Sequence, residues 1–541
     1  MFNFKRMFKF AAAAAVALGM VSCAGEDIRT ASEGNMIPDN AVFAMQVNAG
    51  QLWDKALGAP GSEARQLWAM SKKSLPLVAS SLGEIGTLVN DVVSDPAKIG
   101  LCMDKPMVLS FSADMNNFAD EQASGEACLV ALLEDSEAFV KTVDSVLKLV
   151  RDETGIVISK EEVGSSYAYY SFSIDEEVAV DALVTDESVV IRLKGDTTGE
   201  IKNLKASMLE LFANGGPAAA KGLDAFYGSK GEFAMWMNYE GIMNMAMPVL
   251  ESEEPSSVAV FQQYMPMLKG ASMVMDLEFK NGQTVLQCKV FGAEEMMKYS
   301  EKYYAEASSK YLAEIPFEPC VVVNGAMKDL AGLVKEMSAA SPELAEGFEY
   351  LESELGIDEK FIEGLPGLIT FALDGRGIDY RELPGFLLLM ECDANVWEFA
   401  EQYLEMYADE VEEDLYCIED MFCISYAEGT LKVADIYTFI SQPDEYSYED
   451  SYLGQQIEKG GVVIDLSKLP SSVLDAAARE IDYSMTGSQL LEFVNSIVIN
   501  YHDTTSTVTM NMGDSKENLL GKFVQTALEE VLDDYPLFDM L

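Results

Sequence analysis

The sequence is poor in histidine, which limits the catalytic chemistry it can support. His502 is the single histidine among 541 residues, so a Ser-His-Asp or Cys-His catalytic system would have to be built on it alone. It stands at the end of an apolar run next to a predicted turn, and no GxSxG segment occurs in the chain. We therefore expect His502 to be a solvent-facing strand residue. One histidine also excludes HExxH zinc sites, facial triads and His-rich copper sites.

Nucleotide and zinc motifs are lacking as well. There is no Walker A loop and no CxxC pair, and the glycines of residues 195–200 have the wrong spacing for a dinucleotide fingerprint. The sequence holds eight cysteines, and most of them lie inside apolar, strand-like runs. We expect them to be small buried hydrophobes rather than a disulfide framework. A hairpin disulfide between Cys417 and Cys423 remains an open alternative.

Basic residues are scarce relative to acidic ones. The chain carries 37 Lys and Arg against 90 Asp and Glu, a formal charge of −53. Such a charge disfavours nucleic acid and anionic membrane surfaces as partners, because few cations are present to neutralise phosphates. Hydrophobic residues nevertheless make up 49% of the sequence, which predicts a folded chain with a solvated acidic surface.

No apolar run is long enough to span a bilayer, but the N-terminus has the form of an export signal. A short basic segment, residues 1–9, precedes an apolar run over residues 10–20, and Val21-Ser22-Cys23 follows. This ending is close to a lipobox, in which a cysteine receives the lipid. We predict a lipoprotein signal peptide over residues 1–22 and a membrane anchor at Cys23. A soluble secreted protein with an incidental cysteine is the alternative.

Residues 23–35 are predicted to be a polar tether between the lipid and the fold. Within it, Glu26 and Asp27 resemble the short acidic tags that direct lipoproteins to the outer face of the outer membrane. A solvated linker would look the same. We expect an outer-membrane lipid-anchored protein, on the cell surface or on the periplasmic face.

The mature chain contains two runs of elements in the same order. Each begins with an apolar strand and a helix, at 41–47 and 49–57 and again at 320–324 and 328–339. Later in each run come alternating strands, at 156–194 and 415–440. Each run closes with a hairpin and a terminal helix. The first hairpin spans 272–291, with a type I′ turn predicted at Asn281-Gly282, and its helix spans 293–312. The second spans 496–512, around residues 503–504, and its helix spans 516–533.

This order predicts an α+β fold of two related halves, at 36–313 and 316–541, produced by tandem duplication. Each half is expected to have an antiparallel sheet with packed helices, because the strands alternate with period two and no strict βαβ order occurs. One continuous fold, or three smaller domains, is the alternative.

The signal, Glu26-Asp27, the segment of residues 37–43 and the Asn281-Gly282 hairpin together resemble a family of Bacteroidetes lipoproteins. That family is defined by a large domain of unknown function that covers nearly the whole mature chain. The resemblance implies an envelope location, and it brings no activity and no site residues.

Two acidic clusters are candidate binding segments. Residues 410–414 are predicted to end a helix, where negative charge is unfavourable. A second cluster forms a loop rich in acids and tyrosine that could hold Ca²⁺, although it lacks the EF-hand register, or could meet a sugar or a protein through its tyrosines. A solvated loop is the simpler interpretation, and no other cofactor or metal is expected. The candidate residues are Asp444, Glu445, Tyr446, Tyr448, Glu449 and Asp450, with Tyr452 next to them.

Methionine is frequent, and paired spacing such as Met235/Met237 and Met273/Met275 can suggest a Cu(I) site. In a strand these pairs point to one face, so we expect them to line a core.

The sequence thus favours a non-catalytic, lipid-anchored envelope protein with a binding or interaction role and an unknown protein or glycan partner. The alternative is a carboxylate-based hydrolase of glycans or peptides, which would need a cleft with paired acids of shifted pKa.

Overall fold

The computed structural model describes residues 37–38, 40–58, 62–70, 99–117, 122–163, 167–174, 177–197, 201, 204–214, 221–253, 255–340, 342–365, 367–375, 384–412, 414–418, 421–441, 447–481, 485–502, 504–514 and 516–534. The predicted signal peptide, Cys23, Glu26 and Asp27 lie outside these residues, as do Asp444, Glu445 and Tyr446. Among the described residues, no helix is long and apolar enough to cross a membrane.

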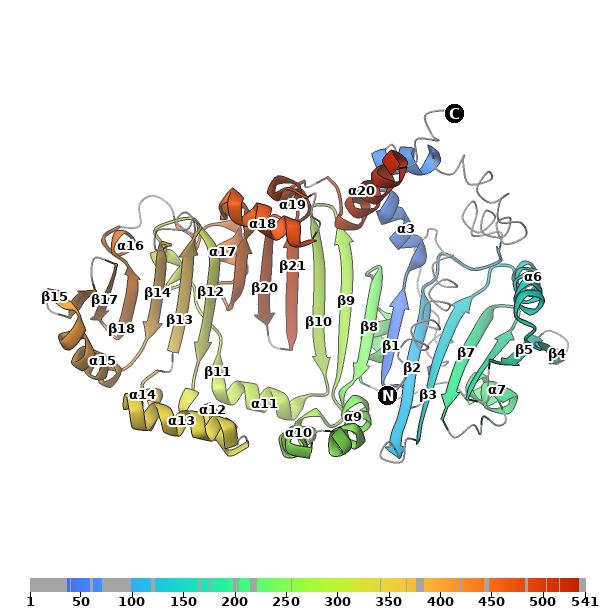
Figure 1. Cartoon of the computed structure of the whole chain (residues 1–541), viewed down its shortest axis with the longest axis horizontal. Coiled ribbons are helices and arrows are strands. Elements are labelled where there is room, and N and C mark those ends of the chain that lie inside the picture. The colour runs from blue at the N-terminus through green and yellow to red at the C-terminus, as the bar shows by residue number, and fades with distance from the viewer. Residues whose placement is uncertain are drawn as a thin grey trace.

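One antiparallel sheet runs the length of the molecule (Figure 1). The order from one edge to the other is β4-β5-β6-β7-β3-β2-β1-β8-β9-β10-β21-β20-β19-β12-β13-β14-β18-β17-β16-β15, with β11 beside the end of β12. The strands are β1 (Phe43–Val47), β2 (Met107–Asn117), β3 (Gln122–Leu132), β4 (Ser159–Val163), β5 (Tyr167–Ser173), β6 (Val178–Val184), β7 (Ser188–Asp196), β8 (Phe233–Asn238), β9 (Ser272–Lys280), β10 (Gln283–Phe291), β11 (Tyr304–Ala305), β12 (Pro319–Met327), β13 (Gly367–Asp374), β14 (Phe386–Glu391), β15 (Asp409–Glu412), β16 (Leu415–Ile418), β17 (Phe422–Ala427), β18 (Thr430–Asp435), β19 (Gly461–Asp465), β20 (Ser496–His502) and β21 (Thr505–Asn511).

The strand order of the first half recurs in the second. Strands β1 to β10 are arranged 4-5-6-7-3-2-1-8-9-10, and strands β12 to β21 repeat that arrangement with eleven added to each number. The two halves meet where β10 pairs with β21. The expected α+β class with a large antiparallel sheet is therefore confirmed. The two halves do not form two separate sheets, because the β10–β21 pairing joins their strands in a single sheet.

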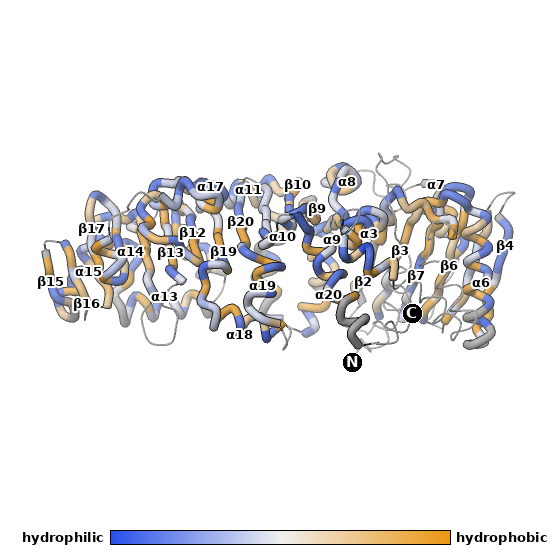
Figure 2. The backbone as a smooth tube through the Cα atoms, turned by 90° about the horizontal axis from the view of Figure 1, so that it is seen from above, coloured by the Kyte–Doolittle hydropathy of each residue, from blue (hydrophilic) through white to orange (hydrophobic). Residues whose placement is uncertain are grey.

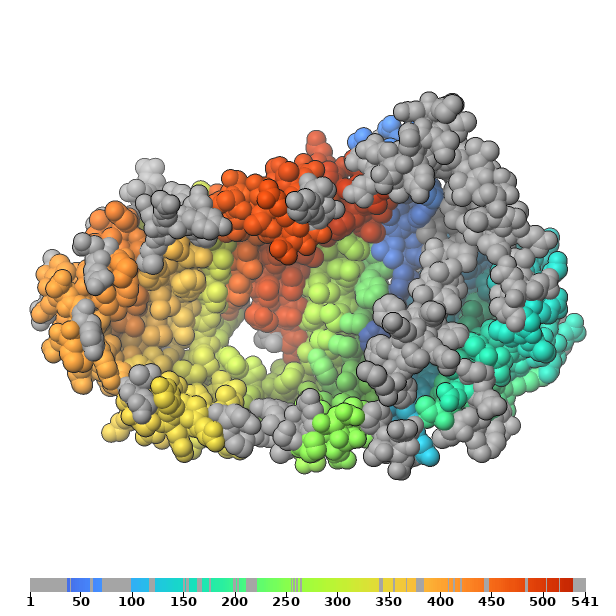
Figure 3. Space-filling view, in the orientation of Figure 1, coloured from blue at the N-terminus to red at the C-terminus, as the bar shows by residue number. Residues whose placement is uncertain are grey.

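Helices gather at the two ends of the strands and on parts of both faces (Figures 1 and 2). In Figure 3 they form an upper rim, with α18 and α19, and a lower rim, with α10, α12 and α13, around a hollowed sheet surface. The described helices are α3 (Ala49–Leu57), α6 (Ser136–Thr154), α7 (Leu204–Asn214), α8 (Leu223–Tyr227), α9 (Tyr239–Glu253), α10 (Pro255–Leu268), α11 (Glu294–Tyr303), α12 (Leu330–Ala340), α13 (Pro342–Leu355), α14 (Glu359–Glu363), α15 (Ala394–Tyr407), α16 (Ile436–Ile440), α17 (Tyr452–Gln456), α18 (Ser471–Ile481), α19 (Gly487–Phe493) and α20 (Leu519–Asp534), with short 3-10 turns at Leu312–Glu314 and Leu466–Lys468.

The core lies mainly on one face of the sheet, here called the covered face. In the first half it centres on Trp236 and Ala234, which alternate along β8 and pack with Phe226 of α8. In the second half it centres on strand residues such as Val322 and Leu387, which pack under the segment of residues 307–317. On the opposite face, α6 and α15 cover the two outer ends of the sheet.

The methionine pairs do not line the main core. Met235 and Met237 of β8 are half-buried and point away from the buried Ala234 and Trp236, and Met273 and Met275 of β9 behave in the same way. Both members of each pair share one face, as the period of two predicted, but that face is the half-buried one opposite the main core.

Several other details differ from the sequence-based expectations. The acidic run 410–414 does not end a helix, since α15 ends at Tyr407 and β15 pairs with β16 instead. The first terminal helix is shorter than expected and ends at Tyr303, where β11 pairs with β12. Residues 436–440 form α16 because the Asp435 side chain accepts hydrogen bonds from the Tyr437 and Thr438 amides.

The cysteines follow the expectation in part and resolve one alternative. Cys128, Cys320 and Cys392 are buried and free, as the apolar runs around them predicted. Cys417 and Cys423 lie directly opposite each other on β16 and β17 and form a disulfide. This bond links β16 to β17, the second and third strands from the outer edge of the second half.

The two ends of the folded chain are clasped together. The C-terminal helix α20 packs against α3, and Asn518 just before it donates from Nδ2 to the Lys55 carbonyl oxygen at 3.0 Å. Its Oδ1 accepts from the Gly521 amide at 2.9 Å. The Lys55 ammonium in turn donates to the Phe279 carbonyl oxygen and lies 3.7 Å from the buried Glu232 carboxylate. This clasp fixes the second half against the first.

Asn518→Ala should weaken the clasp measurably. Asn518 is 4% exposed, so its removal leaves the Gly521 amide without its side-chain partner and the Lys55 carbonyl with only the Gly58 amide at 3.2 Å. We expect the free energy of unfolding in urea to fall by about 1–3 kcal/mol. Asn500→Ala is the matched control, because the Asn500 amide makes only an exposed 3.4 Å hydrogen bond to Gln456. It should cost less than about 0.5 kcal/mol, and equal losses in the two variants would contradict the clasp.

Candidate functional site at the junction of the two halves

The strand register places four polar side chains in one row across the junction. Gln283 of β10 lies opposite Asn511 of β21, Asn511 opposite Ser496 of β20, and Ser496 opposite Asp465 of β19. Residues directly opposite in neighbouring strands point to the same face, here the covered face. Strands are spaced about 4.8 Å apart, so the row is roughly 14 Å long. We call these four residues the polar row.

All four residues of the polar row line one pocket, and a second pocket without any of them adjoins it; together the two pockets are called the junction site. The first has a volume of about 420 Å³ and the second about 500 Å³, and Ser467 and Asn495 line both. The first pocket is lined by Asn281, Gly282, Gln283, Tyr452, Leu453, Asp465, Ser467, Asn495, Ser496, Asn511 and Met512. The second is lined by Ser467, Ser488, Leu491, Glu492, Asn495, Gly513, Asp514, Glu517 and Lys522.

The hairpin turn at Asn281-Gly282 closes the first-half side of the site. Gly282 has a φ of 78°, which a side chain would strain, whereas Asn281 is not in the left-handed region. The turn is therefore not of type I′, and the prediction of that turn type is wrong. Its conformation is set by the second half, because the Gly282 amide donates to the Glu517 carbonyl at 2.6 Å and its carbonyl accepts from the Met512 amide at 2.8 Å.

The acid and hydroxyl groups of the row are held in fixed positions. Asp465 caps the following 3-10 turn, since its Oδ1 accepts from the Ser467 amide at 3.0 Å and from the Ser467 hydroxyl at 2.6 Å. Asn511 donates from Nδ2 to the Ser496 hydroxyl at 2.9 Å. Asp465 and Ser496 are buried. These bonds preorganise the floor of the site.

Other groups in the site are left available. In the part of the chain that the structure describes, the side-chain amides of Asn281, Gln283 and Asn495 make no hydrogen bond. Tyr452 is the first residue of α17 and is 59% exposed. Helix α17 lies close to the preceding loop because Gly454 has no Cβ, which would otherwise meet the Tyr448 carbonyl at 2.0 Å.

The corresponding strand ends of the first half carry a partly different set of side chains. Asn238 ends β8, Ser272 begins β9 and Phe291 ends β10, and the strand register pairs them as it pairs Asp465, Ser496 and Asn511. Asn238 caps the following helix as Asp465 caps its 3-10 turn, since its Oδ1 accepts from the Gly241 amide at 3.1 Å. Ser272 is buried and donates to the Lys221 carbonyl oxygen. Phe291 places an aromatic ring where the second half has the Asn511 amide, and none of these three residues lines a described pocket.

The predicted acidic loop is only partly within the described residues. Tyr448 is buried in the core of the second half, so its ring is not available to stack on a ligand. Glu449 accepts a hydrogen bond from the Ser309 hydroxyl at 2.5 Å, and the exposed Asp450 helps to form the turn before α17. Among the described residues, no group of three or more acidic, cysteine or histidine side chains could hold a metal ion. His502 is exposed at the end of β20, as predicted.

A third pocket, of about 390 Å³, lies on the opposite face of the sheet. It is lined by apolar side chains of α3 and of β1 to β3, with Leu520 of α20. It contains no polar side chain that could orient a ligand.

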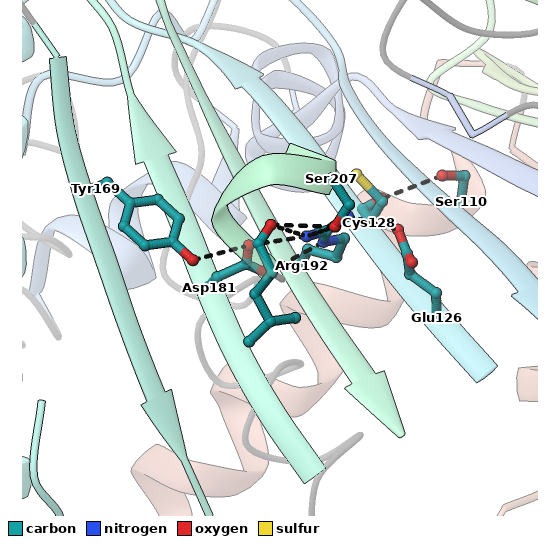
Figure 4. A network of polar contacts seen from close by, with 8 residues as sticks. Ser110, Glu126, Cys128, Tyr169, Asp181, Arg192 and Ser207 are labelled. Atoms are coloured by element: carbon teal, nitrogen blue, oxygen red, sulfur yellow. Dashed lines mark hydrogen bonds and ion pairs between the residues drawn. The ribbon is translucent and has the colours of Figure 1, made fainter. Parts of the chain in front are cut away.

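A cluster of buried charges, drawn in Figure 4, is formed by residues that line none of the three pockets. Arg192 of β7 donates from Nε and Nη2 to the two carboxylate oxygens of Asp181 at 3.1 and 3.0 Å. It also donates to the Leu204 carbonyl at 2.7 Å and to the Ser207 hydroxyl at 2.9 Å, both in α7. Glu126 lies 3.6 Å from its Nη1. The cluster therefore fastens α7 to the covered face.

Burial controls protonation in this cluster. It raises the pKa of Asp181 and of Glu126, and the Arg192 guanidinium partly opposes both shifts. Burial also raises the pKa of the neighbouring Cys128 thiol to about 12, which keeps it protonated and unreactive. The arrangement is structural, since every charged group in it is satisfied within the fold.

Replacing Arg192 by Met should destabilise the protein in a pH-dependent manner. Removal of the guanidinium leaves the buried Asp181 carboxylate with only the 3.5 Å hydrogen bond from the Tyr169 hydroxyl and raises its pKa further. The free energy of unfolding should fall by about 3–5 kcal/mol at neutral pH. Because folded Asp181 would then bind its proton more tightly than unfolded Asp181, the loss should shrink as the pH falls towards about 5.

Urea unfolding at the two pH values measures this difference. Arg65→Met is the control, since Arg65 and Asp54 form an exposed pair, and it should cost about 0–1 kcal/mol. A loss from Arg192→Met that did not change with pH would show that Asp181 is not the group responsible.

Comparison with known proteins gives little further information. No protein-family profile and no curated protein matches the sequence. A solved structure described as crystal form IV of TP0453 aligns with 52% of this chain and 90% of its own, at 10% identity and a TM-score of 0.24. A likeness this distant transfers neither a fold nor an activity.

Proposed function

We propose that the protein is a lipid-anchored component of the cell envelope that binds a ligand at the junction site without transforming it. The observation that carries the binding role is the polar row with the first of the two pockets, to which both halves contribute side chains. The predicted lipid at Cys23 and the resemblance to Bacteroidetes lipoproteins support the location at the outer membrane. Protease treatment of intact cells distinguishes the cell surface from the periplasmic face.

The two halves, at 36–313 and 316–541, are part of this proposal as the products of a tandem duplication. The recurring strand order supports it. So does a reciprocal contact: α20, which ends the second half, packs on α3 of the first, and α11, which ends the first half, packs on α12 of the second through Lys302 and Glu336. A duplicated and fused pair would create the β10–β21 ladder, and with it the junction site.

The distribution of carboxylates favours binding over hydrolysis. Burial raises the pKa of Glu126, Asp181 and Asp276, but none of these three residues lines a described pocket. Asp276 accepts a hydrogen bond from the Ser229 hydroxyl at 2.8 Å. In a glycosidase, the carboxylic acid of raised pKa faces the scissile bond. Here the acids of that kind hold strands and helices together.

The anchor can be tested by metabolic labelling with an alkyne analogue of palmitate. We expect Cys23→Ser to abolish the label, because lipidation requires that thiol. Cys102→Ser is the control and should keep it. Label incorporation is a better readout than fractionation, since an uncleaved signal would itself hold the variant at the membrane. Persistent labelling of Cys23→Ser would place the anchor elsewhere.

The binding role can be tested by thermal unfolding of the chain without its predicted signal peptide and lipid, here called the soluble chain, in the presence of defined compound classes. The classes are neutral oligosaccharides, acidic oligosaccharides, peptides, nucleotides, fatty acids and Ca²⁺. A ligand that binds only the folded state raises Tm, by an amount equivalent to about 2.7 kcal/mol at a hundred times its Kd. We expect at least one class to do so in the unmodified protein, and the double variant Gln283→Ala/Asn511→Ala to reduce the shift. Thr505 lies at the opposite end of β21 from Asn511, so Thr505→Ala should not change the shift in Tm.

Two results would overturn this role. One is the absence of any shift that depends on Gln283 and Asn511. The other is hydrolysis of a glycan or peptide that is lost on replacing a carboxylate pair of the junction site, which would favour the hydrolase alternative.

A further inference from the structure

The junction site combines an exposed aromatic ring with a line of amides and hydroxyls. Tyr452 lines the first pocket beside Leu453, and its ring is largely free of protein contacts because 59% of the residue is exposed. An aromatic ring with one polar tip offers an apolar face and a hydrogen-bonding edge at the same place. The apolar faces of pyranose rings stack on such a surface.

The polar row faces the same pocket as the ring. Gln283 and Asn511 each supply an amide, with both a donor and an acceptor, and Asn281 and Asn495 add two more. Vicinal sugar hydroxyls pair with side chains of this kind, because each hydroxyl both donates and accepts. Side chains along the row repeat at the strand spacing of about 4.8 Å, which is comparable with the advance per residue of an extended β-linked sugar chain.

The charges of the site select against anions. Asp465, Glu492, Asp514 and Glu517 are the acids that line the two pockets. The cation among the lining residues, Lys522, is already paired with Glu492 at 2.9 Å. A phosphate or a uronate would therefore be repelled, while the carboxylates could accept hydrogen bonds from neutral hydroxyl groups.

A bare cation and an apolar ligand fit the site less well. Asp465 Oδ1 is occupied by the amide and hydroxyl of Ser467, and no metal-binding group is found among the described residues. The apolar pocket lies on the other face of the sheet. The first pocket instead offers oriented polar groups beside one aromatic wall, a combination that fixes the orientation of a small organic ligand.

We propose that the junction site binds a neutral oligosaccharide, with Tyr452 as the stacking surface and Gln283, Asn511 and Asp465 as hydrogen-bonding partners. This inference rests on the proposed binding function and names the class of ligand for the same site. One oligosaccharide is bound per chain, because the first half has Phe291 where the second has Asn511, and Asn238, Ser272 and Phe291 line no described pocket.

The test is isothermal titration of the full soluble chain with cellotetraose, xylotetraose and maltotetraose, and with tetragalacturonate as the anionic counterpart. We expect at least one neutral tetrasaccharide to bind at a ratio of one per chain and tetragalacturonate to bind at least tenfold more weakly. Tyr452→Ala should weaken binding about tenfold, equivalent to about 1.4 kcal/mol, whereas Tyr452→Phe should retain most of it. Gln283→Ala should weaken it about threefold to tenfold, and Thr505→Ala should leave it unchanged.

Three outcomes would overturn the inference: no binding of any neutral tetrasaccharide, binding that Tyr452→Ala does not weaken, or equal binding of tetragalacturonate. If another compound class then raises Tm in a manner that depends on Gln283 and Asn511, the proposed function stands and only the saccharide is wrong. If no class does so, both fail. Because Tyr452 is exposed, its variants should unfold at the Tm of the unmodified protein, and saturation-transfer NMR of the same samples checks binding independently of heat.

Discussion

The pairing of β10 with β21 is the interaction on which the rest of the architecture depends. It joins seven residues of each strand, from Gln283 opposite Asn511 to Lys289 opposite Thr505, and links two ten-strand arrangements into one sheet. Neither half has a free edge at this point, so the ladder removes two surfaces that would otherwise pair with other chains. The clasp between α3 and α20 then ties the ends of the chain across the same junction.

The ladder also explains why polar groups gather between two apolar cores. The covered face is apolar on either side of the junction, around Trp236 in the first half and Val322 in the second. Along β21, however, every side chain on that face is polar: Thr505, Thr507, Thr509 and Asn511. A core cannot continue across such a strand without burying unpaired hydroxyls and amides. The two cores therefore stop short of each other, and the junction site occupies the interval.

Local features of this fold could be predicted from the sequence, while contacts between distant segments could not. Helix 49–57 and both closing hairpins have the expected residues, because period-two alternation and turn residues are local signals. The polar row needed the β10–β21 register, which joins residues more than two hundred positions apart. The same limit explains the turn at Asn281-Gly282, where bonds from residues 512–517 override the local preference for type I′. The sequence places Tyr452 and Tyr448 in one tyrosine-rich loop, and no local pattern there distinguishes the exposed ring of Tyr452 from the buried ring of Tyr448.

The strand ends of the two halves are alike at two positions and differ at a third. The first half has Asn238, Ser272 and Phe291, and the second has Asp465, Ser496 and Asn511. The cap and the buried hydroxyl are common to both, since Asn238 and Asp465 each accept from a backbone amide of the turn that follows, and Ser272 and Ser496 are both buried. At the third position an aromatic ring in the first half is replaced by an amide in the second. The Asn511 amide donates to the Ser496 hydroxyl and lies opposite Gln283 across the β10–β21 ladder. A ligand of the junction site would therefore depend on an amide for which the first half has an apolar ring.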